Sequence, residues 1–318
     1  MWAAKLDDAS PQFTKIAGSS DNAGGDFVAG TCASAGVRLG NIHGLAAIPD
    51  VGDGSFVAVV HSASDNSVGT VIEVDDPVGA GCAVKLAAAS IGAGALHDPH
   101  WPIFVGTALY VLERTTDGTD KITQIPYSGN TGTASISLAG DLLDGDYVTG
   151  VTGIGNKIYL MGSLAAGGGA ILEVDVVTPT SPKFKTIITG DQSVWGGTGP
   201  DGLTTDGTGL IAWADGRAFY ITLGGTKKAF CGDQAYVFAG EVENLSDYSY
   251  TTPKDCTATG PDHEPLLIYN SQESAVDANV FLDYQPSTTD SSHGKLYFTG
   301  SFDATGKFVE ALDCQVYP

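Results

Sequence analysis

The chain has 318 residues, of which 42% are hydrophobic, and its 37 acidic against 15 basic residues give a formal net charge of -22 at pH 7. A surface this acidic repels phosphate backbones, which argues against nucleic acid as a partner. No apolar run reaches the roughly 18 residues that a transmembrane helix needs, and Met1 to Lys5 lack the apolar stretch of a signal peptide.

Two short strands are predicted before the repeats begin. Residues 1–25 are mostly polar and form an N-terminal extension with one strand candidate, residues 12–17. Residues 26–30 are the second candidate, and they precede the first repeat by about the distance that separates the last strand of one repeat from the next repeat. We therefore expect Phe27 and Val28 to pair with the strand ending near Leu312, which would close the last blade and leave no exposed sheet edge.

The rest of the chain repeats one β-hairpin unit, in which an apolar run, a polar turn and a second apolar run follow one another. The pairs of runs are residues 56–60 with 71–75, 109–112 with 122–125, 158–161 with 171–175, 210–213 with 218–221, and the C-terminal hairpin within 294–314. The runs 71–75 and 171–175 lie roughly two periods of about 50 residues apart, which is typical of propeller blades.

Each repeat opens with a small or imino residue followed by an apolar one. The five openings are Gly44-Leu45, Pro102-Ile103, Gly150-Val151, Gly202-Leu203 and Pro265-Leu266. They predict an all-β protein, a β-propeller with five blades of four-stranded antiparallel sheets, in a single domain over residues 26–318. Residues 236–239 could begin a further blade, so six blades is the alternative.

This pattern resembles the β-propeller superfamily, in the style of NHL-like bacterial repeat propellers, over about residues 26–314. The resemblance implies blades around a central channel, with the repeat openings gathered at one mouth of that channel. It implies an architecture and no particular activity.

The five cysteines are Cys32, Cys82, Cys231, Cys256 and Cys314. None forms a Cys-x-x-Cys pair, so a zinc ribbon, a thioredoxin motif and a haem-attachment motif are absent. Cys231 and Cys256 flank one irregular polar segment, where we expect a disulfide. Cys32 and Cys314 could form a bridge that locks ring closure, and the alternative is that all five are buried thiols. The acidic, Lys-poor composition favours an extracellular or periplasmic location, where disulfides persist.

Five of the six histidines fall on segments expected to meet at the channel mouth. They are His43, His61, His97, His100 and His263. Neutral imidazoles beside carboxylates are the ligands that zinc and copper use. These five histidines are therefore the candidate ligands of a divalent zinc or copper ion. The alternative is that they are solvated loop residues or bond to the neighbouring backbone.

The tripeptide His97-Asp98-Pro99 resembles the motif that opens a blade in arabinanase-like glycoside hydrolases, which are five-bladed propellers. The resemblance implies that Asp98 is a general base, working with a second Asp and a Glu acid from other blades. Asp201 and Glu264 are the candidates for those two roles. Trp101 and Trp195 lie near predicted mouths, where they could stack on a sugar.

Calcium is the other candidate ion, because residues 50–54 and 141–146 place several carboxylates on short turns. Neither segment completes an EF-hand loop, since no Glu stands at its twelfth position. Asp-Gly is also the pair that hairpin turns prefer, so we interpret both segments as turns.

Three functions therefore stay open. The first is a secreted or cell-surface propeller that binds a metal ion, a small molecule or an extracellular protein. The second is a glycoside hydrolase or a metal-dependent hydrolase that uses the same mouth. The third is a structural subunit of an extracellular assembly.

Overall fold

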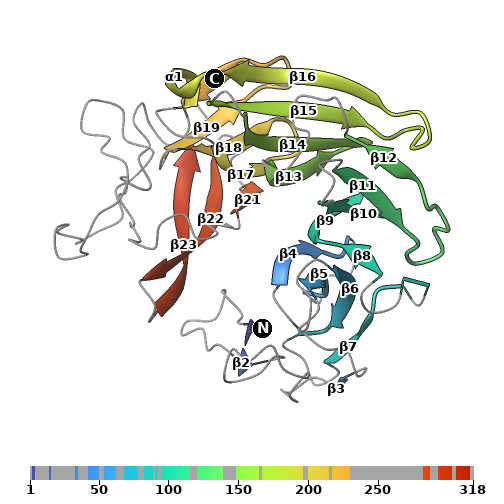
Figure 1. Ribbon diagram of the computed structural model, residues 1–318. Coiled ribbons are helices and arrows are strands. Elements are labelled where there is room, and N and C mark those ends of the chain that lie inside the picture. The colour runs from blue at the N-terminus through green and yellow to red at the C-terminus, as the bar shows by residue number, and fades with distance from the viewer. Residues whose placement is uncertain are drawn as a thin grey trace. The chain divides into compact units, whose positions relative to one another are not determined.

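The computed structural model is an all-β propeller arrangement built from antiparallel sheets (Figure 1). It describes residues 2–3, 14–15, 33–34, 42–49, 54–61, 68–77, 82–88, 90–91, 95–114, 120–138, 148–164, 167–195, 200–214, 217–229, 282–286, 293–302 and 306–315. The chain forms two compact units, one made of Met1–Asp146 with Val177–Pro182 and the other of Tyr147–Val176 with Lys183–Pro318.

Four sheets are blades in which strands adjacent in sequence are adjacent in the sheet. The first blade contains β4 (Ile42–Ala47), β5 (Phe56–His61), β6 (Val68–Asp75) and β7 (Ala83–Leu86), and the second contains β9 (Pro99–Val105), β10 (Ala108–Glu113), β11 (Lys121–Ile125) and β12 (Ser135–Ser137). The third contains β13 (Val148–Ile154), β14 (Lys157–Ser163), β15 (Gly169–Asp175) and β16 (Lys183–Gly190), and the fourth contains β17 (Pro200–Thr205), β18 (Leu210–Ala214), β19 (Arg217–Ile221) and β20 (Lys227–Ala229). The predicted hairpins of these four repeats are confirmed.

The predicted count of five four-stranded blades is wrong, because the described residues form four. The C-terminal sheet contains only three strands, β21 (Leu282–Pro286), β22 (His293–Phe302) and β23 (Gly306–Gln315). Its hairpin has the predicted form, with Leu296 opposite Leu312. The opening at Pro265-Leu266 and the candidate sixth blade at residues 236–239 lie outside the described residues.

The N-terminal segment contributes three two-residue strands. β1 (Trp2–Ala3) pairs with β2 (Thr14–Lys15), which lies inside the predicted strand 12–17. β3 (Ala33–Ser34) adds in parallel to β7, at the outer edge of the first blade. Residues 26–30, which we expected to close the last blade, lie outside the described residues, so that closure stays a prediction.

The innermost strand of every blade carries a β-bulge at its opening, where the pairing register slips by one residue. The bulged residues are His43 in β4, Trp101 in β9, Thr149 in β13 and Asp201 in β17. A bulge interrupts the in-and-out alternation of a strand and re-aims one side chain. The bulge therefore falls on the residue that directly precedes each of these four predicted opening pairs.

The small residue after the bulge is explained by close backbone packing between neighbouring innermost strands. A Cβ on Gly44 would lie 2.8 Å from Pro102 Cδ, and a Cβ on Gly150 would lie 2.6 Å from the backbone nitrogen of Leu203. Because Pro102 and Leu203 belong to the openings of the second and fourth blades, the openings touch within each of the two blade pairs. The rule read from the sequence, a small or imino residue at each opening, has this steric cause.

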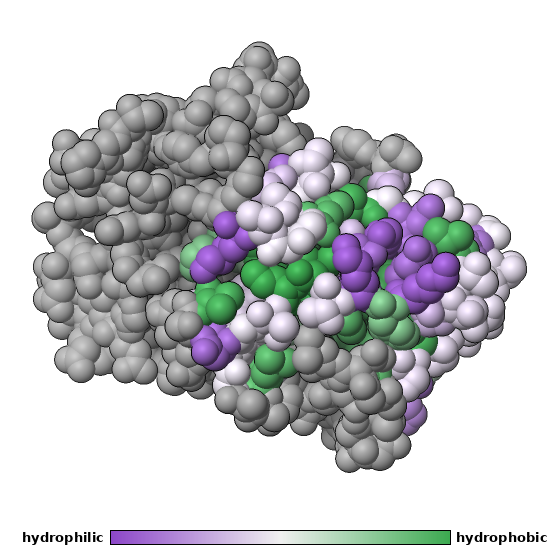
Figure 2. Space-filling model, turned by 90° about the horizontal axis from the view of Figure 1, so that it is seen from above, coloured by the Kyte–Doolittle hydropathy of each residue, from purple (hydrophilic) through white to green (hydrophobic). Residues whose placement is uncertain are grey.

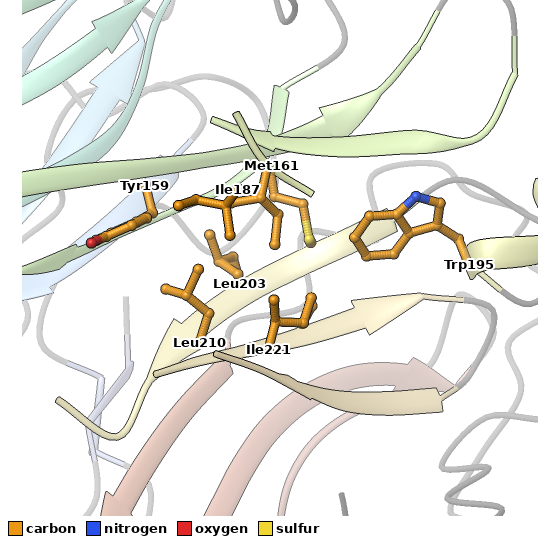
Figure 3. Packing of buried hydrophobic residues seen from close by; sticks show 9 residues of the cluster. Tyr159, Met161, Ile187, Trp195, Leu203, Leu210 and Ile221 are labelled. Atoms are coloured by element: carbon orange, nitrogen blue, oxygen red, sulfur yellow. The ribbon is translucent and has the colours of Figure 1, made fainter. Parts of the chain in front are cut away.

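The core lies between the faces of adjacent blades. In the first unit, alternate residues Val57, Val59, Leu109, Val111 and Ile125 are buried against one another. Figure 3 shows the corresponding cluster of the second unit, labelled at Tyr159, Met161, Ile187, Trp195, Leu203, Leu210 and Ile221. Each large side chain buried in this way contributes about 1.5–3 kcal/mol, so these clusters are the main source of stability.

The described surface mixes hydrophilic and hydrophobic side chains, as Figure 2 shows for the side on which β15 and β16 lie in Figure 1. Large apolar side chains are mostly covered in the described residues; those classed as exposed are Leu45 and Val177. Within the same residues, no helix is long and apolar enough to cross a membrane. The single helix described, α1 (Gln192–Trp195), has four residues.

Candidate metal centre

The first two blades bring three histidines together. His43 is the bulged residue of β4, and His61 is the last residue of β5, its neighbour in the first blade. His100 lies in β9, the innermost strand of the second blade, next to the bulged Trp101. β9 lies beside both β4 and β5, so the three residues meet where the two blades open.

The approach to β9 helps to hold this junction. β8 (Leu96–His97) first pairs with β6 of the first blade, with Leu96 opposite Gly69. After Asp98 the chain then joins the second blade as β9, and Pro99 lies opposite Glu113 of β10. The segment that carries Asp98 is therefore attached to one blade on each side.

The three imidazole rings are in direct contact. His43 and His61 stack with ring centroids 3.9 Å apart and an interplanar angle of 9°. His100 meets His43 edge-on at 4.6 Å and His61 at 5.4 Å. One ring nitrogen from each of the three lies within 4.8 Å of one from each of the others. The group could hold a metal ion.

Hydrogen bonds define which ring nitrogens of His61 and His100 carry a proton. Nε2 of His61 lies 2.9 Å from the carbonyl oxygen of Pro99 and 3.3 Å from Oδ1 of Asp98. Nε2 of His100 lies 3.1 Å from the same Oδ1. A carbonyl and a carboxylate only accept, so each Nε2 donates its N–H and the Nδ1 of each neutral ring carries the lone pair.

Both of these Nδ1 atoms are buried and have no hydrogen-bond partner in the described structure. His61 and His100 are themselves only 2% and 4% exposed, so bulk water does not solvate the rings. Leaving a buried polar atom unsatisfied costs about 1–3 kcal/mol. Buried imidazole lone pairs beside a third imidazole indicate a group suited to ligate a cation.

Burial and the neighbouring charges favour a neutral His100 ring and an ionised Asp98 carboxylate. Burial lowers the pKa of His100, and the charges of Arg114 and His61 act in the same direction, against the opposing effect of Asp98. Burial would raise the pKa of Asp98, but the hydrogen bond from His100 and the charges of His100, His61 and Arg114 outweigh it, so that pKa is lowered. A neutral imidazole held by a carboxylate is the form that binds metals best.

The backbone on either side of His100 is strained. Asp98 has φ of 37° and Trp101 has φ of 34°, values that residues with a side chain rarely adopt. Such strain costs of the order of 1–3 kcal/mol and persists where the surroundings fix the geometry. In this backbone conformation the Asp98 carboxylate faces the rings of His61 and His100, and Trp101 is the bulged residue of β9.

Trp101 and Arg114 line the same junction. The Trp101 ring lies 5.1 Å from the His100 ring, and the Arg114 guanidinium carbon lies 5.7 Å from the Trp101 ring centroid. The backbone N–H of Arg114 donates to the carbonyl oxygen of Asp98 at 3.1 Å. An aromatic face and a fixed cation therefore accompany the histidines.

The other predicted site residues fall elsewhere. His97 is exposed, and its backbone N–H donates to Glu113 Oε2 at 2.9 Å. Asp201 lies at the bulge of β17 in the second unit. His263 and Glu264, like the calcium-candidate segments 50–53 and 141–146 and the Cys231–Cys256 pair, lie outside the described residues. Their predicted roles stay predictions.

Trp195 is fully buried in the core of the second unit and donates its indole N–H to the carbonyl of Gly169 at 2.9 Å, so it is not a sugar-stacking platform. Arg114 was not recognised from the sequence. It directly follows β10, and no motif marks it.

No family model matches the chain, and no curated protein matches it. Among solved structures, the chain is similar to a Bacteroides uniformis protein described as a candidate 6-phosphogluconolactonase. The two are 13% identical, the match covers 99% of this chain and 81% of that chain, and the TM-score is 0.42. A likeness of this degree carries no argument about activity.

Proposed function

We propose that the protein is a β-propeller that binds one divalent transition-metal ion, zinc or copper, through His43, His61 and His100. In this proposal Asp98 does not ligate the ion but holds two of the rings. The protein acts outside the cytoplasm, in the extracellular space or the periplasm, as a binding protein whose partner is reached through the ion.

The observation that carries this proposal is the pair of buried Nδ1 atoms of His61 and His100 without hydrogen-bond partners. Their Nε2 atoms already face Asp98 and Pro99, so neither ring can be flipped without breaking a hydrogen bond. A bound ion would use both lone pairs and remove the cost of leaving them unsatisfied. If the cluster served only for packing, apolar side chains would fill the same space without leaving unsatisfied nitrogen atoms.

The ligand chemistry favours zinc or copper over calcium. Imidazole nitrogen suits zinc and copper, whereas calcium takes oxygen ligands. Metal–nitrogen bonds of about 2.0–2.1 Å around a tetrahedral ion place the nitrogens about 3.3 Å apart. The separations of up to 4.8 Å would therefore have to shorten on binding.

A hydrolase with Asp98 as general base fits the geometry less well. The Asp98 carboxylate accepts a hydrogen bond from His100 and has a lowered pKa, which makes it a weak base near neutral pH. Its contacts suit a group that orients imidazoles. A metal-dependent hydrolase stays compatible with the site, because a zinc ion with three protein ligands retains an open position.

Metal titration of the purified chain tests the proposal. Protein stripped with a chelator is titrated with zinc or copper in competition with a chromophoric chelator, and we expect one ion per chain. The variants His61→Ala and His100→Ala should each lose at least about 100-fold in affinity. The matched control is His97→Ala. It removes an exposed imidazole that is not part of the cluster and should leave the affinity unchanged.

Two results would overturn the proposal. One is the absence of stoichiometric binding by a protein whose circular dichroism shows it to be folded. The other is an equal loss in the His97→Ala control, which would place the binding on surface histidines rather than on the buried cluster.

A further inference from the structure

We infer that, when copper is the ion, the site of His43, His61 and His100 holds it as copper(I) in preference to copper(II). This inference rests on the proposed function, because it concerns the ion that the three histidines bind. It adds the oxidation state, and with it a redox property. Copper(II) that enters the site takes up one electron more easily than copper(II) in water.

The number of ligand atoms favours copper(I). In the part of the chain that the structure describes, the group suited to hold an ion offers three imidazole nitrogens, from His43, His61 and His100. Zinc(II) completes a tetrahedral set of four ligands, and copper(II) prefers a tetragonal set. Copper(I) is satisfied by two or three ligands, so of these ions it is the one that needs nothing beyond the three rings.

The burial of the ring nitrogens favours the same ion. The Nδ1 atoms of His61 and His100 are buried and have no hydrogen-bond partner in the described structure. Asp98, whose side chain is 31% exposed, lies at the other nitrogen of each ring, Nε2. The exposed neighbour is therefore on the side away from the lone pairs that would take the ion. Solvent does not reach those lone pairs to supply the extra ligand that zinc(II) or copper(II) requires.

The charges around the site also favour an ion of lower charge. The cost of moving an ion out of water rises with the square of its charge, so a doubly charged ion costs about four times as much as a singly charged one. Asp98 contacts the Nε2 atoms of the rings and not the Nδ1 atoms. Burial lowers the pKa of His100, and the charge of Arg114 acts with burial, against Asp98. The second positive charge of copper(II) is therefore poorly compensated.

The anchoring of the rings disfavours a tetragonal arrangement. Nε2 of His61 donates to the carbonyl oxygen of Pro99 at 2.9 Å, and Nε2 of His100 donates to Oδ1 of Asp98 at 3.1 Å. The third ring, that of His43, is stacked on His61 with centroids 3.9 Å apart. Spreading the three nitrogens into one plane around copper(II) would disrupt these contacts, because each ring is held on the side opposite its buried nitrogen or by its stacked face.

Parallel titrations of chelator-stripped protein test this inference. Copper(I) is added without oxygen in competition with bicinchoninate, and copper(II) is added in competition with nitrilotriacetate. We expect one ion per chain in both states and a dissociation constant at least about 100-fold lower for copper(I). That ratio raises the reduction potential of the bound ion above that of the aqueous couple by about 120 mV, at about 59 mV for each factor of ten.

Electron paramagnetic resonance gives an independent measurement, because copper(II) has a signal and copper(I) has none. Protein loaded with copper(II) is treated with ascorbate, which supplies one electron to each ion. We expect the signal to disappear while one copper per chain is retained after desalting without oxygen.

A charge variant tests the electrostatic reason. Asp98→Asn removes the negative charge beside the rings, and that charge acts twice as strongly on a doubly charged ion as on a singly charged one. Copper(II) affinity should therefore fall further than copper(I) affinity, so that the preference for copper(I) rises at least about threefold. Asp206→Asn is the matched control. It removes one negative charge from a turn of the second unit, retains the acceptor for the backbone N–H groups of Thr208 and Gly209, and should leave the preference unchanged.

The outcomes distinguish this inference from the proposed function. Protein that binds one copper(II) or zinc(II) ion, but binds copper(I) no more tightly than copper(II), overturns the inference and leaves metal binding intact. An unchanged or smaller preference for copper(I) in Asp98→Asn also overturns it. Protein that is folded by circular dichroism and binds no ion in either oxidation state overturns both.

Discussion

The imidazole of His43 lies flat against that of His61, with ring centroids 3.9 Å apart and planes only 9° from parallel. Two imidazolium ions cannot occupy this arrangement without strong repulsion, and His100 closes the group from the side. Protonation of both stacked rings would therefore disrupt the cluster, so acid should act against it.

Acid is predicted to destabilise the fold through His100. Burial lowers the pKa of His100 in the folded state. At the same pH the unfolded chain therefore binds a proton more readily than the folded chain. The free energy of unfolding should fall as pH drops through the unperturbed imidazole value of about 6.5. Denaturant unfolding at pH 8 and pH 5.5 should show this loss in the wild type. His100→Gln should lose less over the same interval, and His97→Gln, at an exposed position, should behave like the wild type. Equal losses in all three proteins would contradict the prediction.

Asp98 is predicted to be a positioning residue for the metal ligands. Its Oδ1 accepts the hydrogen bond from His100 and lies 3.3 Å from Nε2 of His61. Asp98→Asn keeps the shape but removes the charge, and losing such a partner of a metal-binding histidine typically costs about 10–100-fold in affinity. The same substitution should lower the pKa of His100 further, because Asp98 acts to raise it.

A histidine titration by NMR separates this role from a merely structural one. A general loss of packing in Asp98→Asn would move the His100 pKa toward its ordinary value, whereas the loss of the carboxylate moves it away. Unchanged metal affinity in the variant would show that Asp98 does not orient the rings.

The sequence allowed the blades and the histidine cluster to be predicted because both depend on local rules. Apolar alternation fixes β5, β6, β10 and β11, and the small or imino residue at each opening reflects a backbone contact between neighbouring blades. Aligning those openings predicted five histidines at one mouth, of which His43, His61 and His100 lie together, His97 does not, and His263 lies outside the described residues.

Other features depend on packing that no local pattern records. The outermost strands β7, β12, β16 and β20 went unrecognised; β16, for example, is largely exposed and alternates weakly. Trp195 looked like a residue of the mouth but lies in the core. Arg114 joins the site only through the fold, because it follows β10 and meets Asp98, which precedes β9, at the open end of this antiparallel strand pair.

Gly150 is predicted to be required for packing between the third and fourth blades. A Cβ at this position would lie 2.6 Å from the backbone nitrogen of Leu203, where no flexible side chain can give way. Gly150→Ala should therefore lower the free energy of unfolding by about 1–3 kcal/mol, measured by denaturant titration. Gly224→Ala is the matched control, because a Cβ at this position would lie 3.7 Å from Oγ1 of Thr222, an ordinary contact distance. A variant at Gly150 as stable as the control would refute the steric account of the openings.

The last prediction concerns the cysteines of the first unit. β3 pairs in parallel with β7, with Ala33 opposite Ala83 and Ser34 opposite Val84. The residues that directly precede these pairs in the sequence are Cys32 and Cys82, and Cys82 is disulfide-bonded. Cα atoms of facing residues on neighbouring strands are about 5 Å apart, within the range that a disulfide spans. We therefore expect a Cys32–Cys82 bridge, in preference to the Cys32–Cys314 bridge that chain ends alone suggest.

Peptide mapping of alkylated, unreduced protein decides between these pairings. A linked peptide containing Cys32 and Cys82, beside the expected Cys231–Cys256 link, would leave Cys314 as the single alkylated thiol of the five. Cys82→Ser should then free Cys32 for alkylation and lower stability by about 2–4 kcal/mol, because the bridge closes a loop of about 50 residues. Recovery of Cys32 linked to Cys314 would instead support a covalent closure between the two ends of the chain, and alkylation at both Cys32 and Cys82 in the wild type would exclude the register argument.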